Sequence, residues 1–206
     1  MIKTISIDGK DVKFSFSLAS FYIYKNQFGQ DAMSVILPLF ADIANAVDPE
    51  DISSDGVISS DKLFKVAGDV LDQLISVEIT EIADIIWAFA KAADDDIPEP
   101  ALWYGSFEEF PLFDVGKELL PCLYDSLISK KKDTEKYPDN KNEEKVGIDE
   151  IYVAATTCGL DSGMVNKMTI GNLVDYVVAY NKLHGLDKEE EQEGTRMATQ
   201  EDFDMF

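Results

Sequence analysis

Residues 80–95 read TEIADIIWAFAKAADD, and this stretch carries the strongest helical pattern in the chain. Its apolar residues recur at the three- and four-residue spacing that places them on one face of an α-helix. That face consists of Ile82, Ile85, Ile86, Phe89, Ala90 and Ala93. A helix with so wide an apolar face must bury it against other elements, so this segment is predicted to lie in the core.

Toward the N-terminus, residues 2–17 (IKTISIDGKDVKFSFS) predict a β-hairpin. Asp8-Gly9 is a strong signal for a two-residue turn, because this turn needs positive φ angles that glycine adopts at little cost. After the turn, Val12, Phe14 and Phe16 alternate with polar residues and therefore share one face. A lone hairpin is marginally stable in water, so helices are expected to cover that face.

Four further segments also carry helical spacing: 18–28, 31–43, 60–74 and 114–129. Gly29 is predicted to end the first of them, and Pro38 to kink or restart the second. Residues 97–113 are predicted to be irregular, because three prolines interrupt any helix there. Their aromatic side chains are expected to clamp this segment onto the core.

The rest of the chain divides by composition. Residues 133–147 are polar and read as a linker, whereas 148–186 hold three short helical patterns. Residues 187–206 carry eight acids against two basic residues, and this tail is predicted to be disordered when alone. The predicted fold is therefore mainly α with a small N-terminal β-hairpin (α+β). It comprises a helical domain over 1–132, the linker, a small C-terminal three-helix module and the acidic tail.

The charge balance excludes several function classes. The chain has 40 Asp and Glu against 18 Lys and Arg, a net charge of −22. This charge repels phosphates and anionic lipid heads, so no nucleic acid and no membrane are expected as partners. It favours solubility and attraction to basic partners, which also fits an acidic DNA mimic. The two cysteines and the absence of a long apolar run predict a protein of a reducing compartment, the cytoplasm.

No catalytic, cofactor or metal site is predicted. His184 is the only histidine and is interpreted as a residue at a helix C-terminus. The stretch from Asp51 to Ile58 copies the first eight positions of an EF-hand loop, but Lys62 stands where the bidentate Glu belongs. A capped loop with an Asp-Gly turn is the preferred interpretation, and weak calcium binding stays open. Residues 148–184 resemble a helix-turn-helix in spacing but offer too few cations for DNA.

Longer stretches resemble a known family. FSFSLASFYIYKNQFGQDAMSVILPLF (14–40) and IIWAFAKAADDDIPEPALWYGSFEEFPL (85–112) are similar to tail assembly chaperones of siphophages that infect Gram-positive hosts. GIDEIYVAATTCGLDSGMVNKMTIGNLVDYVVAYNKLHG (147–185) resembles the downstream extension of the long form. It is followed by RMATQEDFDMF (196–206), in which MATQEDFDMF (197–206) is the most specific motif.

The resemblance implies the function and the partners. Such chaperones bind the tape measure protein, are thought to recruit tail tube subunits around it, and leave before the tail is complete. A short form and a longer, frameshifted fusion are made. The Lys130-Lys131-Lys132 run lies where the short form would end, which fits a ribosomal frameshift as well as a solvated basic helix end. Self-association into oligomers is also expected.

Two groups of residues are candidate partner contacts. For the tape measure protein they are Trp103, Tyr104, Phe107 and Phe110, with an internal clamp as the alternative. For the tube subunit they are Phe203, Met205 and Phe206, because these side chains lie in a tail too polar to fold alone. Two other classes stay open: an acidic DNA mimic or inhibitor that binds a basic partner, and a structural subunit of the virion.

Overall fold

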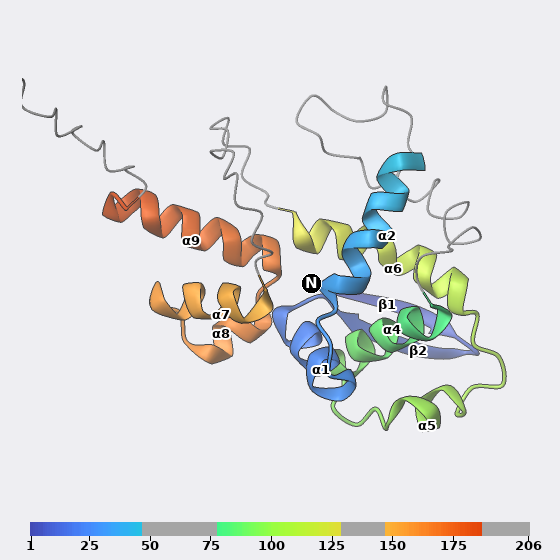
Figure 1. Ribbon diagram of the computed structural model, residues 1–206. Coiled ribbons are helices and arrows are strands. Elements are labelled where there is room, and N and C mark those ends of the chain that lie inside the picture. The colour runs from blue at the N-terminus through green and yellow to red at the C-terminus, as the bar shows by residue number, and fades with distance from the viewer. Residues whose placement is uncertain (47–77, 129–146, 187–206) are drawn as a thin grey trace, which may run out of the picture.

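The computed structural model describes residues 1–46, 78–128 and 147–186. These residues form a two-stranded antiparallel sheet and eight helices, which confirms the predicted α+β class (Figure 1). The elements are β1 (Ile2–Ile7), β2 (Lys10–Ser15), α1 (Leu18–Phe28), α2 (Met33–Ala46), α4 (Ile79–Ala93), α5 (Pro100–Tyr104), α6 (Leu112–Leu127), α7 (Ile148–Thr157), α8 (Ser162–Lys167) and α9 (Ile170–His184). Within these ranges no helix has both the length and the apolar content to span a lipid bilayer.

The hairpin forms as the sequence predicts. Ile7 pairs with Lys10 across the turn, and the register runs to Ile2 opposite Ser15. Asp8 and Gly9 have φ angles of 50° and 70°, so both central residues adopt the positive values that a tight two-residue turn requires. Val12, Phe14 and Phe16 are buried, which confirms the predicted inner face.

Helix α4 packs against β2 of the hairpin and against α1 (Figure 1). It begins one residue before the predicted start, where Glu78 and Glu81 form a capping box. The Phe89 ring contacts those of Phe16 and Phe21, with centroids 5.2 and 5.7 Å away. Trp87 is also buried, and its indole N–H donates to the carbonyl of Pro98 at 2.8 Å. The helix is therefore covered on more than the one face that its spacing predicts.

The neighbouring helices follow the predicted pattern closely. Gly29 ends α1, and the Asp31 carboxylate accepts from the Met33 N–H at 2.9 Å at the start of α2. Helix α2 continues through Pro38, which lies inside it. The predicted helix over 60–74 and the loop that precedes it lie outside the described residues.

The prediction for residues 97–113 is wrong in one respect. Residues Pro100–Tyr104 form a short helix, α5, with the proline in its first turn. The first N–H groups of a helix have no internal partner, so a proline costs little there and its fixed φ suits the helix. Helix α6 follows directly after Pro111, two residues before the predicted start, and it too contains a proline, Pro121.

The three C-terminal helices form as predicted and pack against the body. Asp161 and Thr169 accept hydrogen bonds from backbone N–H groups at the starts of α8 and α9. The Leu18 N–H donates to the carbonyl of Met168 at 2.9 Å, and the Tyr22 and Tyr152 rings meet edge to face. Apolar residues of the module belong to the same buried cluster as those of the body: Ile148, Ala155, Leu160, Val165, Ile170 and Leu173.

Candidate functional site

The four predicted aromatic contact residues lie together at the α5 end of the body. The rings of Trp103, Tyr104, Phe107 and Phe110, called here the aromatic cluster, pack edge to face with centroids 4.7–5.5 Å apart. Trp103 is buried, whereas the other three are half-buried. Such edge-to-face pairs stabilise the positions of their neighbours beyond the area they bury.

The aromatic cluster is fastened to the hairpin and to α4. The Tyr104 hydroxyl donates to the carbonyl of Ala83 at 2.6 Å, and burial raises the pKa of Tyr104 with a further contribution from the charge of Asp84. The Lys10 ammonium lies 4.9 Å from the centre of the Phe107 ring. It also donates to the backbone carbonyl of Ser106 at 2.7 Å. The clamp expected from the sequence is therefore confirmed, and the use of these rings by a partner stays a prediction.

The second predicted group, Phe203, Met205 and Phe206, lies outside the described residues. The Lys130-Lys131-Lys132 run and the EF-hand-like loop at 51–62 lie outside them as well. Interpretations that rest on these residues stay predictions.

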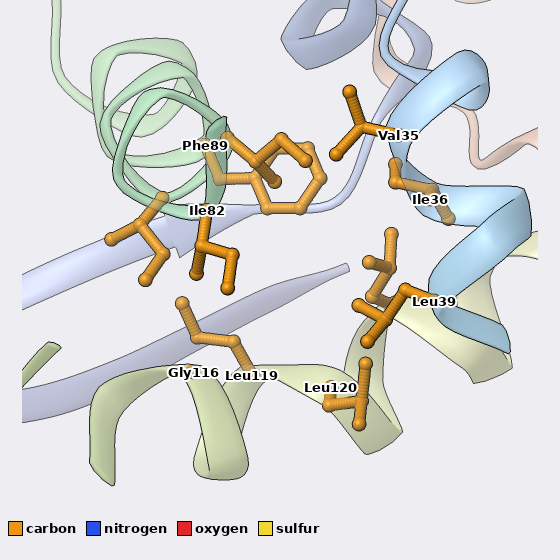
Figure 2. A pocket seen from close by; sticks show the side chains of 11 residues that line it. Val35, Ile36, Leu39, Ile82, Phe89, Gly116, Leu119 and Leu120 are labelled. Atoms are coloured by element: carbon orange, nitrogen blue, oxygen red, sulfur yellow. The ribbon is translucent and has the colours of Figure 1, made fainter. Parts of the chain in front are cut away.

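A cavity that the sequence did not predict lies between α2, α4 and α6. Side chains of the three helices point toward one another across a space of about 40 Å³ (Figure 2). Eleven residues line it: Val35, Ile36, Leu39, Ile82, Ile85, Ile86, Phe89, Gly116, Leu119, Leu120 and Leu123. None of these residues has a polar side chain, so the cavity suits aliphatic or aromatic groups and offers no hydrogen bonds to a polar ligand from side chains.

Gly116 is the one sequence signal that could have located this cavity. Glycine inside a helix costs about 1 kcal/mol relative to alanine, so its presence within the apolar stripe of α6 calls for a packing reason. Having no side chain, Gly116 leaves part of the space between the helices empty. Apolar spacing alone predicts which residues are buried but not where their side chains fail to meet.

The helices around the cavity carry mainly negative charge. They hold six carboxylates (Asp42, Glu81, Asp84, Asp114, Glu118 and Asp125) and two lysines (Lys91 and Lys117). Lys91 donates to the backbone carbonyls of Asp95 and Ile97, at 2.5 and 2.7 Å. Burial raises the pKa of Asp84, and the nearby charge of Glu81 raises it further. The cavity is thus an apolar space between three helices of net negative charge.

In the described ranges, no three His, Cys, Asp or Glu side chains converge into a potential metal site. His184 is the last residue of α9, as predicted. The centroid of its ring lies 4.2 Å from the centroid of the Tyr180 ring. Burial raises the pKa of the Cys122 thiol, and Cys158 is buried. These two cysteines are not disulfide-bonded.

Comparison with protein-family models, with curated proteins and with solved structures finds no match to this chain. The cavity, the aromatic cluster and the charge distribution are therefore the observations on which a function can be argued.

Proposed function

We propose that this chain is a tail assembly chaperone of a siphophage that infects a Gram-positive host. In this proposal it is not an enzyme. It binds and solubilises the tape measure protein in the host cytoplasm, recruits tail tube subunits, and is absent from the mature virion. The family resemblance suggests these roles, and the observation that carries the proposal is the apolar cavity between α2, α4 and α6, helices that carry six carboxylates against two lysines.

The physical requirements of such a chaperone match this arrangement. A tape measure protein is a very long helix with apolar stripes, which aggregate unless a partner covers them. An apolar space between helices is the kind of site that receives the apolar face of an amphipathic helix. The net charge of −22 supports solubility and draws in basic partners. A chaperone must also release its client, so several modest contacts serve it better than one permanent interface.

Co-expression with the tape measure protein of the same phage genome tests the proposal. We expect the chain to move the tape measure protein from the insoluble to the soluble fraction and to be recovered with it in a pull-down. A tape measure protein that stays insoluble and unbound would overturn the proposal. Recovery of a basic DNA-binding protein in its place would favour the acidic inhibitor.

Three further experiments separate the chaperone from a virion subunit, test the frameshift and test the role of the C-terminal tail. Mass spectrometry of purified virions should not find this chain, whereas a structural subunit would be abundant. Sequencing the gene tests the frameshift, which requires a run of adenines in the codons for Lys130-Lys131-Lys132. Deletion of residues 197–206 should abolish capture of the tail tube protein and leave capture of the tape measure protein intact.

A further inference from the structure

Helices α2 and α6 each contain a proline, Pro38 and Pro121, but among the described residues α6 also packs against β1, α4 and α9, so α2 is the wall with less support from neighbouring elements. Pro38 has no N–H, so the carbonyl of Ser34 receives no bond from the residue four positions on. Prolines inside helices are also the commonest points at which helices bend. The wall formed by α2 therefore has a natural bending point just beside the residues that line the cavity.

The two faces of α2 meet different surroundings at this point. Ile36 lines the cavity and is fully buried, whereas its neighbour Leu37 is 48% exposed. One helical turn on, the Phe40 ring contacts that of Tyr124 on α6, with centroids 5.4 Å apart. The cavity-lining residues of α2 are all apolar, so moving this part of the wall from α4 and α6 breaks no hydrogen bond between cavity side chains.

The shape and charge of the site indicate what could enter it. A volume of about 40 Å³ holds roughly three water-sized spheres, enough for the end of one aliphatic side chain and too little for a whole helix. A larger occupant therefore requires α2 to move outward. Six carboxylates against two lysines on the surrounding helices favour an occupant whose polar faces are basic.

We propose that α2 is the movable wall of this site. It bends at Pro38 so that the apolar ridge of an amphipathic, lysine- and arginine-flanked helix inserts between α2 and the α4–α6 pair. This inference rests on the proposed function, since it names the class of segment of the tape measure protein that the chaperone holds. One aliphatic side chain of that segment occupies the existing cavity, and the basic flanks are attracted by the net negative charge of the three helices.

Filling the cavity tests this proposal with a closely matched control. Ile36→Phe adds bulk into the cavity, whereas Leu37→Phe adds the same kind of ring on the exposed side of the same helix. The probe is a synthetic helical peptide of about 18 residues with leucines at helical spacing and lysines elsewhere. A scrambled peptide of the same composition measures attraction by charge alone. Affinities are measured by fluorescence anisotropy of the labelled peptides against the full chain.

We expect the Leu/Lys peptide to bind the wild type and Leu37→Phe equally. Ile36→Phe should bind it about tenfold more weakly, a loss of about 1.4 kcal/mol. The scrambled peptide should bind all three chains weakly and equally. Equal binding of the Leu/Lys peptide by Ile36→Phe and the wild type would overturn the proposal, as would equal binding of the two peptides by the wild type. If Ile36→Phe does not fold, Val35→Ile replaces it, because it adds a single methylene at the same cavity.

The bending point is tested separately with Pro38→Ala, which restores the missing N–H. This variant should melt at a higher temperature and associate with the peptide more slowly. An unchanged association rate would contradict the proposal that α2 bends at Pro38. The peptide assay and the co-expression assay can fail independently. If the wild type does not distinguish the two peptides but still binds the tape measure protein, only the inference about the site between α2, α4 and α6 is contradicted. If the wild type distinguishes the two peptides but does not bind the tape measure protein, the proposed function is contradicted.

Discussion

Gly171 in α9 lies directly against the backbone of Ile128 at the end of α6. A Cβ atom at position 171 would be 2.1 Å from the carbonyl oxygen of Ile128 and 2.7 Å from its carbonyl carbon. Distances this short are not tolerated between non-bonded atoms, and the obstacle is backbone, which cannot turn aside as a flexible side chain would. The crossing of α9 over the end of α6 therefore requires glycine at this position.

We expect Gly171→Ala to destabilise the packing of the C-terminal module. Overpacking of a buried site costs about 1–3 kcal/mol, and contact with backbone places this variant at the upper end. Gly147→Ala is the matched control, because nothing lies within 4 Å of a Cβ at that position. Urea unfolding should show a lower midpoint for Gly171→Ala alone. Equal midpoints for the two variants would mean that α6 and α9 move apart with no loss of unfolding free energy.

Asp149 should make the stability of the chain depend on acid pH. Its carboxylate accepts from the Lys25 ammonium and from the Tyr22 hydroxyl, and these two hydrogen bonds lower its pKa. A lowered folded-state pKa contributes stability above the unfolded-state value of about 3.9, and the contribution is lost as pH falls through the folded-state value. The melting temperature of Asp149→Asn should lie below that of the wild type at pH 7. The difference should shrink below about pH 4. A constant difference across this range would contradict the ionic origin.

Tyr22 should produce an effect at the opposite end of the pH scale. Burial, followed by the hydrogen bond to Asp149, raises its pKa to about 12. The folded chain therefore holds this proton more tightly than the unfolded chain, and stability should fall as pH rises from about 10 to 12. Tyr22→Phe should flatten this part of the stability profile. A profile that Tyr22→Phe leaves unchanged would contradict this assignment.

The aromatic cluster should contribute chiefly to stability. Trp103→Ala removes a buried indole that contacts three other rings, so we expect a loss of about 3–5 kcal/mol in unfolding free energy. Tyr104→Phe removes only the hydrogen bond to Ala83, with an expected loss of about 1 kcal/mol. Both are measured by urea unfolding. If Tyr104→Phe is as stable as the wild type yet loses tape measure binding, the hydroxyl serves the partner directly.

Phe89 should be the most sensitive position of the hairpin–helix core. Its ring contacts Phe16, just after β2, and Phe21 on α1, and it also borders the cavity. Phe89→Ala should therefore cost about 3–5 kcal/mol. Phe89→Leu keeps most of the apolar volume and should lose less than half of that. Near-equal losses for the two variants would show that ring geometry, and not volume, is the main contribution.

The sequence was most informative where local chemistry decides the structure. Asp8-Gly9 predicted the tight turn, and Gly29 predicted the end of α1. The same local chemistry operates at the start of α9, where the Thr169 hydroxyl accepts a hydrogen bond from the backbone N–H of Asn172. The prolines of residues 97–113 misled the prediction, since a proline that breaks the interior of a helix is well tolerated in its first turn, as Pro100 is.

The candidate site was far less predictable. Aromatic residues in an irregular segment suggest either an internal clamp or an exposed surface, and only the contacts of Tyr104 with Ala83 and of Lys10 with Phe107 show the clamp. The cavity depends on how three helices from distant parts of the sequence approach one another. The distances between these helices follow from tertiary packing, and the spacing of apolar residues along the sequence does not specify them.

The backbone bond from Leu18 to Met168 has a consequence for any shorter product of the same gene. A chain that ended before residue 147 would lose the acceptor for the Leu18 amide, together with the tyrosine and the carboxylate that meet Tyr22. Its first helix would then present to solvent a surface that the full-length chain covers. Such a shorter chain would thus differ from this one in the accessible surface of α1.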